Sequence, residues 1–598
     1  MRRSVIALAT AAVVLAILGL GDALISADPD RQTGGDAELT EQLLEMLFQQ
    51  GVSPECVLGA DSEGIPILCE TAGEGESASA QARQATTSGL PAGTRGWETI
   101  PGVIRDDGLE SSRLEVDVNG PVSRVTIDNV SLFLIFSEPE PFELRDDGLN
   151  GDRVAGDFVF TSGPFRFDTS RTMPSFFLND SSSPAGLSTL RLGFLSIEEL
   201  DGTVTAFLIE PSVGILSSDI PETNAITLSP NVAVSPHLIN VRSDGRQSQL
   251  FLRFRSESDL QALAQPIYEV LPDMFDFFML FSMDHVERLP RTFGRNFVAG
   301  THLQVKTDFT GTGLGPLDNT ALFGSEGRLL GINVLDSYSR GISSRNATHE
   351  LLHQWVNFIS PTLGLSQTHY PVRSSVGSLV GGFLWTDNGD GTFTRQCDQG
   401  NGGAHQAPPL DKYMMGLVDS SEVGPIRVDL GSGSVCGGAD IIDNFTTVTI
   451  ADIQRGHGVR TPGPADAQRD FAIAFVAESH DRFLTPTEMT FYEILAGQYT
   501  KAVPPQDPDP YVGPNWVPIT RFFGEGTAWR SDTSLPAVPV TIDVTPGSPK
   551  NIINVANRCV IPVAILGSTT FDVNTVNVTS VRFGPGQAPV ASAGRQLM

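Results

Sequence analysis

Residues 344–355 read SRNATHELLHQW and contain the pattern HExxH. On a helix, His349 and His353 lie four residues apart on one face, so both imidazoles can reach the same metal ion. Glu350 would project beside them, where its carboxylate can take a proton from water activated by that ion. The chain has only nine histidines, so a chance match to this pattern is uncommon. The alternative is a helix whose histidines merely face solvent or core. We expect a helix that carries a zinc site.

A catalytic zinc site needs a third protein ligand and an open coordination position. Between Gln354 and Thr386 the sequence contains no Asp, Glu or Cys, and its one candidate ligand is His369 in SQTHYPV. We therefore expect His369 to complete the site. The alternatives lie further on, in polar loops: Asp387, Asp390 and His405. Both aspartates belong to TDNGDGTFT, which is more simply a hairpin turn.

A hydrolytic site also needs a group that stabilises the developing oxyanion. The candidates are Tyr370, beside the expected third ligand, and Tyr413 in LDKYMMGL. An ordinary apolar helical turn explains LDKYMMGL equally well. Upstream of the HExxH segment, LLGINVLDS (329–337) is a candidate edge strand that could pair with an extended peptide.

The order HELLHQW (349–355), THYPV (368–372), SVGSLVGGFLW (375–385) and PLDKYMMGL (409–417) resembles a group of secreted bacterial zinc metallopeptidase-like proteins. Members carry HELxHxW, a later HW or HY, and a segment of the form Leu-[Asp/Glu]-x-Tyr-Leu-Met-Gly-Leu. The resemblance covers roughly residues 240–525. It implies a zincin-like α+β fold in which His349, His353 and His369 bind zinc and Glu350 is the general base. The chain departs from the group in having Met414 where the group has Leu.

The length of 598 residues exceeds what one hydrophobic core supports, which predicts several domains. We expect a zincin-like catalytic domain at 216–530, with helical patterns at Glu257–Phe281 and around 343–358. An Ig-like β-sandwich at 97–215 would precede it, because RLEVDV, SRVTIDNVSLFLIF and TVTAFLIE alternate in hydropathy. A linker and partial β-module at 531–598 would follow it. The predicted fold is therefore multidomain, with an α+β catalytic domain flanked by β-sandwich modules.

The N-terminus predicts export. Residues 1–27 combine Arg2 and Arg3 with an uncharged apolar run and small residues, as in a cleaved signal peptide. Residues 28–96 are mostly low-complexity, with one expected helix at 38–50, and could be a propeptide. No later stretch is long and apolar enough to span a membrane. The five cysteines suggest two disulfides, Cys56–Cys69 and Cys397–Cys436, with Cys559 unpaired.

An aspartate-rich loop, DDGLNGDRVAGDFVF (146–160), lies within the expected sandwich. Its oxygen side chains could hold Ca²⁺: Asp146, Asp147, Asn150, Asp152 and Asp157. The alternative is a pair of tight Asp/Gly turns between strands. The phrase DDGxNGDxxAGDxxF also resembles a motif of Ig-like modules that precede enzyme domains in secreted bacterial proteins.

The net charge of −31 argues against nucleic acid and anionic membrane surfaces as partners. Two functions remain. The first is a secreted zinc metallopeptidase that acts on protein or peptide substrates. The second is an exported binding or adhesion protein with a non-catalytic zincin-like scaffold, whose β-modules contact a cell surface or polysaccharide. The intact Glu350 favours the first, because a scaffold does not need it.

Overall fold

The computed structural model describes most of the chain between Thr94 and Thr533, and only short segments outside that range. Besides shorter breaks, residues 172–185, 207–211, 244–256, 283–299, 336–344, 360–368, 398–405 and 502–518 are not described. The signal-peptide stretch, the helix expected at 38–50, His405 and the cysteines Cys56, Cys69 and Cys559 therefore lie outside the described residues. None of the described helices is long and apolar enough to cross a membrane. Within the described part the chain is rich in β-strands and has six α-helices.

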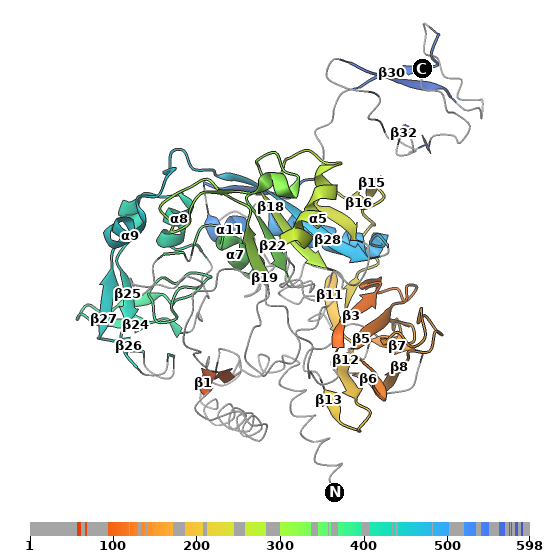
Figure 1. Ribbon diagram of the computed structural model, residues 1–598, viewed down its shortest axis with the longest axis horizontal. Coiled ribbons are helices and arrows are strands. Elements are labelled where there is room, and N and C mark those ends of the chain that lie inside the picture. The colour runs from red at the N-terminus through yellow and green to blue at the C-terminus, as the bar shows by residue number, and fades with distance from the viewer. Residues whose placement is uncertain are drawn as a thin grey trace.

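An eight-stranded sheet forms the centre of the molecule (Figure 1). Five of its strands, β17, β28, β18, β22 and β29, run parallel, and β19 pairs antiparallel with β22 at the edge. In spatial order the strands are β15 (Ile226–Ser229), β16 (Val232–Val234), β17 (Leu238–Ser243), β28 (Asp470–His480), β18 (Phe277–Ser282), β22 (Gly331–Leu335) and β19 (Gly300–Gln304), and β29 (Ala528–Arg530) pairs with β28.

The central strands are buried on both faces. In β18, Phe277, Met279 and Phe281 face one core cluster, while Phe278 and Leu280 face another on the opposite side. The first cluster includes α7 (Arg345–Leu352) and α10 (Pro486–Tyr499), and the second includes α5 (Glu257–Tyr268). A strand covered on both sides reads as a continuous apolar run rather than an alternating one.

This double burial corrects one prediction. The helix expected over Glu257–Phe281 ends at Tyr268, and Phe277–Ser282 is a central strand instead. The apolar run FDFFMLF was ambiguous because periodicity cannot separate a strand buried on both faces from a buried helix. The helix expected around 343–358 is present as α7.

A second correction concerns the edge of the sheet. LLGINVL does contain a strand, β22, but β22 lies between β18 and β19. Its hydrogen-bonding groups are thus used on both sides, and it cannot pair with a peptide. Among the described strands, β19 (Gly300–Gln304) forms the edge of the sheet on this side.

An N-terminal β-unit, from Thr94 to Leu216, lies to one side of the central sheet (Figure 1). Its strands share a core that includes Trp97, Leu114, Val125 and Ile197. RLEVDV forms β5 as the alternation indicated. The strands are β3 (Thr94–Ile100), β4 (Val103–Arg105), β5 (Arg113–Val118), β6 (Arg124–Asn129), β7 (Leu134–Phe136), β8 (Phe142–Leu144), β9 (Val159–Thr161), β10 (Phe165–Phe167), β11 (Leu187–Arg191), β12 (Gly193–Glu198), β13 (Val204–Ala206) and β14 (Ser212–Leu216).

Helix α10 joins the N-terminal β-unit to the central sheet. Thr485 caps it in a capping box with Glu488, as the sequence Thr-Pro-Thr-Glu predicts. Glu488 is fully buried, and it also accepts hydrogen bonds from the backbone of Gly102 (2.6 Å) and from the guanidinium of Arg482. One carboxylate therefore caps a helix, pairs with an arginine and fixes the neighbouring unit.

A third group of elements lies on the opposite side of the central sheet from the N-terminal β-unit (Figure 1). The disulfide Cys397–Cys436, expected from the sequence, is present there. The group comprises α8 (Pro409–Met415), α9 (Ile450–His457), β23 (Trp385–Asp387), β24 (Phe393–Arg395), β25 (Ile426–Asp429), β26 (Ile441–Ile442), β27 (Phe445–Val448) and η7 (Ser420–Glu422). The remaining elements are β1 (Val57–Ala60), β2 (Pro66–Leu68), β20 (Lys306–Thr307), β21 (Leu317–Asp318), η4 (Thr320–Phe323), α11 (Ile519–Phe523), β30 (Thr541–Val544), β31 (Val563–Leu566), β32 (Arg582–Phe583) and β33 (Ala588–Pro589).

Candidate metal centre

Most of the HExxH segment lies on α7, which packs on the central sheet through its apolar side. The helix ends at Leu352, and His353 lies in the turn that follows. Ala347, Leu351 and Leu352 are fully buried in the core beneath the helix. Just beyond its end, Trp355 packs edge-on against Phe277 of β18, with ring centroids 5.6 Å apart. This anchoring holds the helix in place and leaves the histidine face turned toward the opposite segment.

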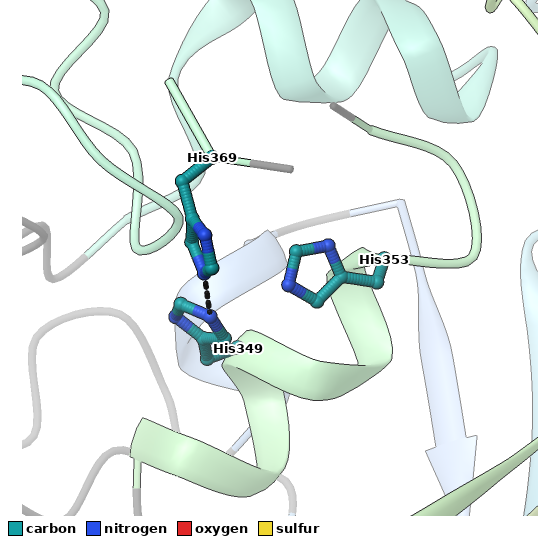
Figure 2. Close-up of side chains that lie close together, drawn as sticks. All are labelled: His349, His353 and His369. Carbon is teal, nitrogen blue, oxygen red and sulfur yellow. Dashed lines mark hydrogen bonds between the residues drawn. The ribbon is translucent and has the colours of Figure 1, made fainter. Parts of the chain in front are cut away.

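Three histidines meet at this helix. Figure 2 shows His349 on α7 and His353 just past the end of that helix, with His369 reaching toward them from the segment across from them. Each can offer one ring nitrogen such that the three nitrogens all lie within 4.8 Å of one another. Nε2 of His349 and Nε2 of His369 are 2.9 Å apart. The structure thus brings together the three residues that the sequence analysis proposed as ligands.

The ring orientation of His349 is set by the backbone. Its Nδ1 lies 2.9 Å from the carbonyl oxygen of Leu379. A carbonyl can only accept, so Nδ1 carries the proton and donates it. Nε2 of His349 is consequently left with its lone pair facing His369, which is the form that binds a metal ion.

Burial controls the charge of the site. It lowers the pKa of His353 to about 2, with further lowering by the nearby His349 and His369. Burial also lowers the pKa of His369. Imidazoles with lowered pKa values are neutral at physiological pH, and only the neutral ring can act as a ligand.

Glu350 lies in the same helix and is buried. Burial raises the pKa of its carboxyl group to about 8. In the metal-free protein this group therefore holds a proton at neutral pH. A divalent cation at the neighbouring histidines would favour the ionised form, because an opposite charge nearby lowers a carboxyl pKa.

The donor set fits zinc. Three neutral imidazoles within reach of one ion are a common catalytic zinc site, which leaves a fourth position for water or substrate. A carbonyl that accepts from the far nitrogen of a ligand, as Leu379 does for His349, is the usual outer support of such sites.

A network of polar side chains that joins β19 and β22 to the end of the HExxH segment is not predicted by the sequence. His302 of β19 hydrogen-bonds through Nδ1 to Asn333 of β22 and through Nε2 to Gln354, just beyond α7. The amide of Gln304 donates to the carbonyl of His353 over 2.7 Å. The edge strand is thereby tied to the end of the HExxH segment. The position of Gln354 right after the second histidine was the one available signal, but nothing in the sequence linked it to His302.

The two tyrosines proposed for the oxyanion are both buried. The hydroxyl of Tyr413 accepts hydrogen bonds from Gln454 Nε2 (3.0 Å) and from the backbone of Arg460 (3.1 Å). Burial, and then the negative charge of Asp411, raise the pKa of Tyr370 well above its usual value. Both hydroxyls thus lie in packed surroundings, and neither enters the function proposed below.

The rival ligands are placed elsewhere. Asp387 ends β23 and Asp390 lies in the turn between β23 and β24, within the hairpin expected from TDNGDGTFT. Their carboxylates accept hydrogen bonds from Gly389 and Thr392 in that turn. They hold the hairpin in shape, while His405 lies outside the described residues.

The aspartate-rich loop of the N-terminal β-unit brings together carboxylate oxygens of Asp146, Asp152 and Asp157 within 4.8 Å of one another. Asp146 accepts backbone hydrogen bonds from Gly156 and Phe158, and Asp152 accepts one from Gly148. Asp147 bonds locally to Leu149, and Asn150 adopts a positive φ of 54°. The turn geometry accounts for these contacts, and the Ca²⁺ site stays a prediction.

Comparison of the chain with protein-family models, with curated proteins and with solved structures finds no match.

Proposed function

We propose that the chain is a secreted zinc metallopeptidase whose catalytic unit is a zincin-like α+β domain. The observation that carries this proposal is the convergence of His349, His353 and His369, with the buried Glu350 directly after His349 in the chain. Export is supported by the N-terminal sequence and by the disulfide Cys397–Cys436, because disulfides form and persist in oxidising compartments.

His349, His353 and His369 would hold the zinc ion. When bound, zinc polarises a carbonyl and lowers the pKa of water toward neutrality. Glu350 accepts the proton that the attacking water gives up and later donates it to the leaving amine. Its low exposure suits both steps, because a carboxyl pKa raised toward neutrality allows the same group to act as base and then as acid.

The substrate would bind along β19. This strand is the edge of the central sheet on the side of α7, and its Gln304 contacts the carbonyl of His353. An extended peptide that pairs with this edge would run beside the metal centre, with main-chain hydrogen bonds supplying affinity. Such binding favours proteins and peptides as substrates over small molecules.

The test is zinc content and caseinolysis of the wild-type protein beside Glu350→Gln. The wild type should bind zinc and cleave casein in a chelator-sensitive manner. Glu350→Gln should retain zinc and lose activity by at least about 100-fold, the scale of a general base. Glu422→Gln, an exposed glutamate in η7, is the control and should match the wild type.

A wild-type protein that binds zinc yet cleaves nothing that a chelator can block would overturn the peptidase proposal. That outcome would leave the exported binding or adhesion protein, with its metal site as a structural element. Loss of zinc from Glu350→Gln would instead show that Glu350 serves the metal site and is not its base.

A further inference from the structure

Main-chain carbonyl groups of one short turn, Ser378–Gly381, accept hydrogen bonds at two of the three proposed ligands. One bond comes from His349 itself and the other from the residue after His369. The carbonyl of Leu379 accepts the Nδ1 proton of His349. The carbonyl of Val380 accepts a hydrogen bond from the backbone of Tyr370, which directly follows His369, over 2.9 Å. The turn therefore sets the orientation of His349 and the path of the chain at His369.

The turn fits closely against the Tyr370 segment. Tyr370 and Gly381 form an isolated β-bridge. At Gly381, where φ is +126°, a Cβ atom would lie 2.2 Å from the carbonyl oxygen of Tyr370. Only glycine allows this approach. A displacement of the turn would thus move the chain beside His369 as well.

Asp411 of α8 holds this turn in place through a hydrogen bond with Ser378. Its side chain is completely buried, and Oδ2 accepts a hydrogen bond from Ser378 Oγ over 2.6 Å. Ser378 Oγ in turn accepts from the backbone of Val380 over 3.1 Å. A chain of hydrogen bonds thus runs from a buried carboxyl group on α8 through Ser378 into the turn that presents Leu379 to His349.

A buried carboxyl group is costly, and burial raises the pKa of Asp411 to about 7. An apolar side chain at this position would pack α8 without that cost. A role in fixing the turn explains why a polar, ionisable group stands there, since a buried hydrogen-bonded group specifies one arrangement of its partners.

We propose that Asp411 is a positioning residue of the metal centre, and that it acts through Ser378 to fix the carbonyl that orients His349. This inference rests on the proposed metal site and deepens it. Groups that support a metal-bound histidine from outside typically change metal affinity by about 10–100-fold. Asp411 is one contact further out, so we expect the lower part of that range.

The experiment measures zinc affinity by competition with a chromophoric chelator, together with the visible absorption spectrum of the Co²⁺-substituted protein. The variants are Ser378→Ala, Asp411→Ala, their double variant and Asp411→Asn. Ser378→Ala should weaken zinc binding by about tenfold and alter the Co²⁺ spectrum. Because both residues act through one hydrogen bond, the double variant should lose no more affinity than Asp411→Ala alone.

Asp411→Asn tests the contact itself, since an asparagine oxygen can still accept the hydrogen bond from Ser378. We expect it to bind zinc more tightly than Asp411→Ala. The control is Asp276→Asn, another buried aspartate, which contacts Arg328 and the backbone of Ala472 instead of the turn. It should lower thermal stability without changing zinc affinity.

Wild-type zinc affinity in Ser378→Ala and Asp411→Ala alike, with an unchanged Co²⁺ spectrum in both, would overturn this inference and leave the metal site standing. An equal loss in Asp276→Asn would also overturn it, because the effect would then be one of general stability. A wild-type protein without zinc affinity would remove the metal centre and this inference together. A zinc-binding protein without peptidase activity would contradict only the peptidase proposal.

Discussion

Nε2 of His349 and Nε2 of His369 lie 2.9 Å apart, although twenty residues separate them in the chain. His349 has its proton on Nδ1, where it is donated to Leu379, so the contact between the two Nε2 atoms needs the proton of His369. Two nitrogens on one tetrahedral zinc ion lie about 3.3 Å apart, given bond lengths of about 2.0–2.1 Å. A metal ion would thus replace a proton with little movement of either ring.

His369→Ala should weaken zinc binding by more than the roughly 10–100-fold typical of an outer-shell change, because it removes a direct ligand. Chelator competition measures the loss. His457→Ala, at the end of α9 and outside the cluster, is the matched control and should bind zinc as the wild type does. Unchanged zinc affinity in His369→Ala would remove it from the ligand set and bring His405 back into consideration.

The helix and its two histidines could be predicted from the sequence because a spacing of four residues fixes their relative direction locally. The third ligand was proposed by elimination, since His369 is the one metal-binding side chain between Gln354 and Thr386. No other side chain in that stretch could serve as a metal ligand, so His369 could be chosen without knowledge of the fold.

Other features depend on contacts between segments that are distant in the chain, and local sequence patterns do not reveal such contacts. The strand Phe277–Ser282 carries apolar side chains on both of its faces, because each face packs against a different core cluster. The group that orients His349 is the main-chain carbonyl of Leu379. Because every residue has such a carbonyl, the sequence does not reveal which one accepts this hydrogen bond. The hydrogen bond between Ser378 and Asp411 joins residues 33 positions apart in the chain, and it forms only when α8 packs against the turn.

Removal of the disulfide by the double change Cys397→Ser and Cys436→Ser should lower stability by roughly 3–4 kcal/mol, since the bridge closes a segment with a sequence separation of 39. Thermal unfolding in the presence and absence of reductant measures the effect. Reductant should lower the unfolding temperature of the wild-type protein more than that of the double variant, which keeps the expected Cys56–Cys69 disulfide. If reductant leaves the wild-type transition in place while the double variant unfolds earlier, the serines themselves disturb the packing.

Glu488→Gln should destabilise the protein by about 2–3 kcal/mol, because it breaks the ion pair between the fully buried Glu488 and the partly exposed Arg482 and weakens the bond to Gly102. Asp452→Asn is the matched comparison: Asp452 holds the same position in the capping box of α9 but contacts no other unit. It should cost clearly less than Glu488→Gln, because Asp452 is a surface capping residue. Denaturant unfolding distinguishes the two, and equal costs would show that the contact between units adds nothing.

In the metal-free protein, the contribution of Asp411 to stability should fall as the pH rises from about 4 to about 7. Burial raises the pKa of Asp411 from 3.8 to about 7, so the folded state binds more protons than the unfolded state between these values. The free energy of unfolding therefore falls with increasing pH, by at most about 1.4 kcal/mol per pH unit from this group, and levels off above pH 7.

Asp411→Asn cannot ionise and should lack this contribution. Denaturant unfolding of both proteins at a series of pH values, with chelator present, measures the difference. Wild type and variant should be closest in stability near pH 4, and the variant should gain on the wild type steadily up to about pH 7. A difference that stays constant across that range would mean that Asp411 ionises in the folded protein as it does in the unfolded chain. It would then follow that α8 leaves a path for water to reach the carboxyl group.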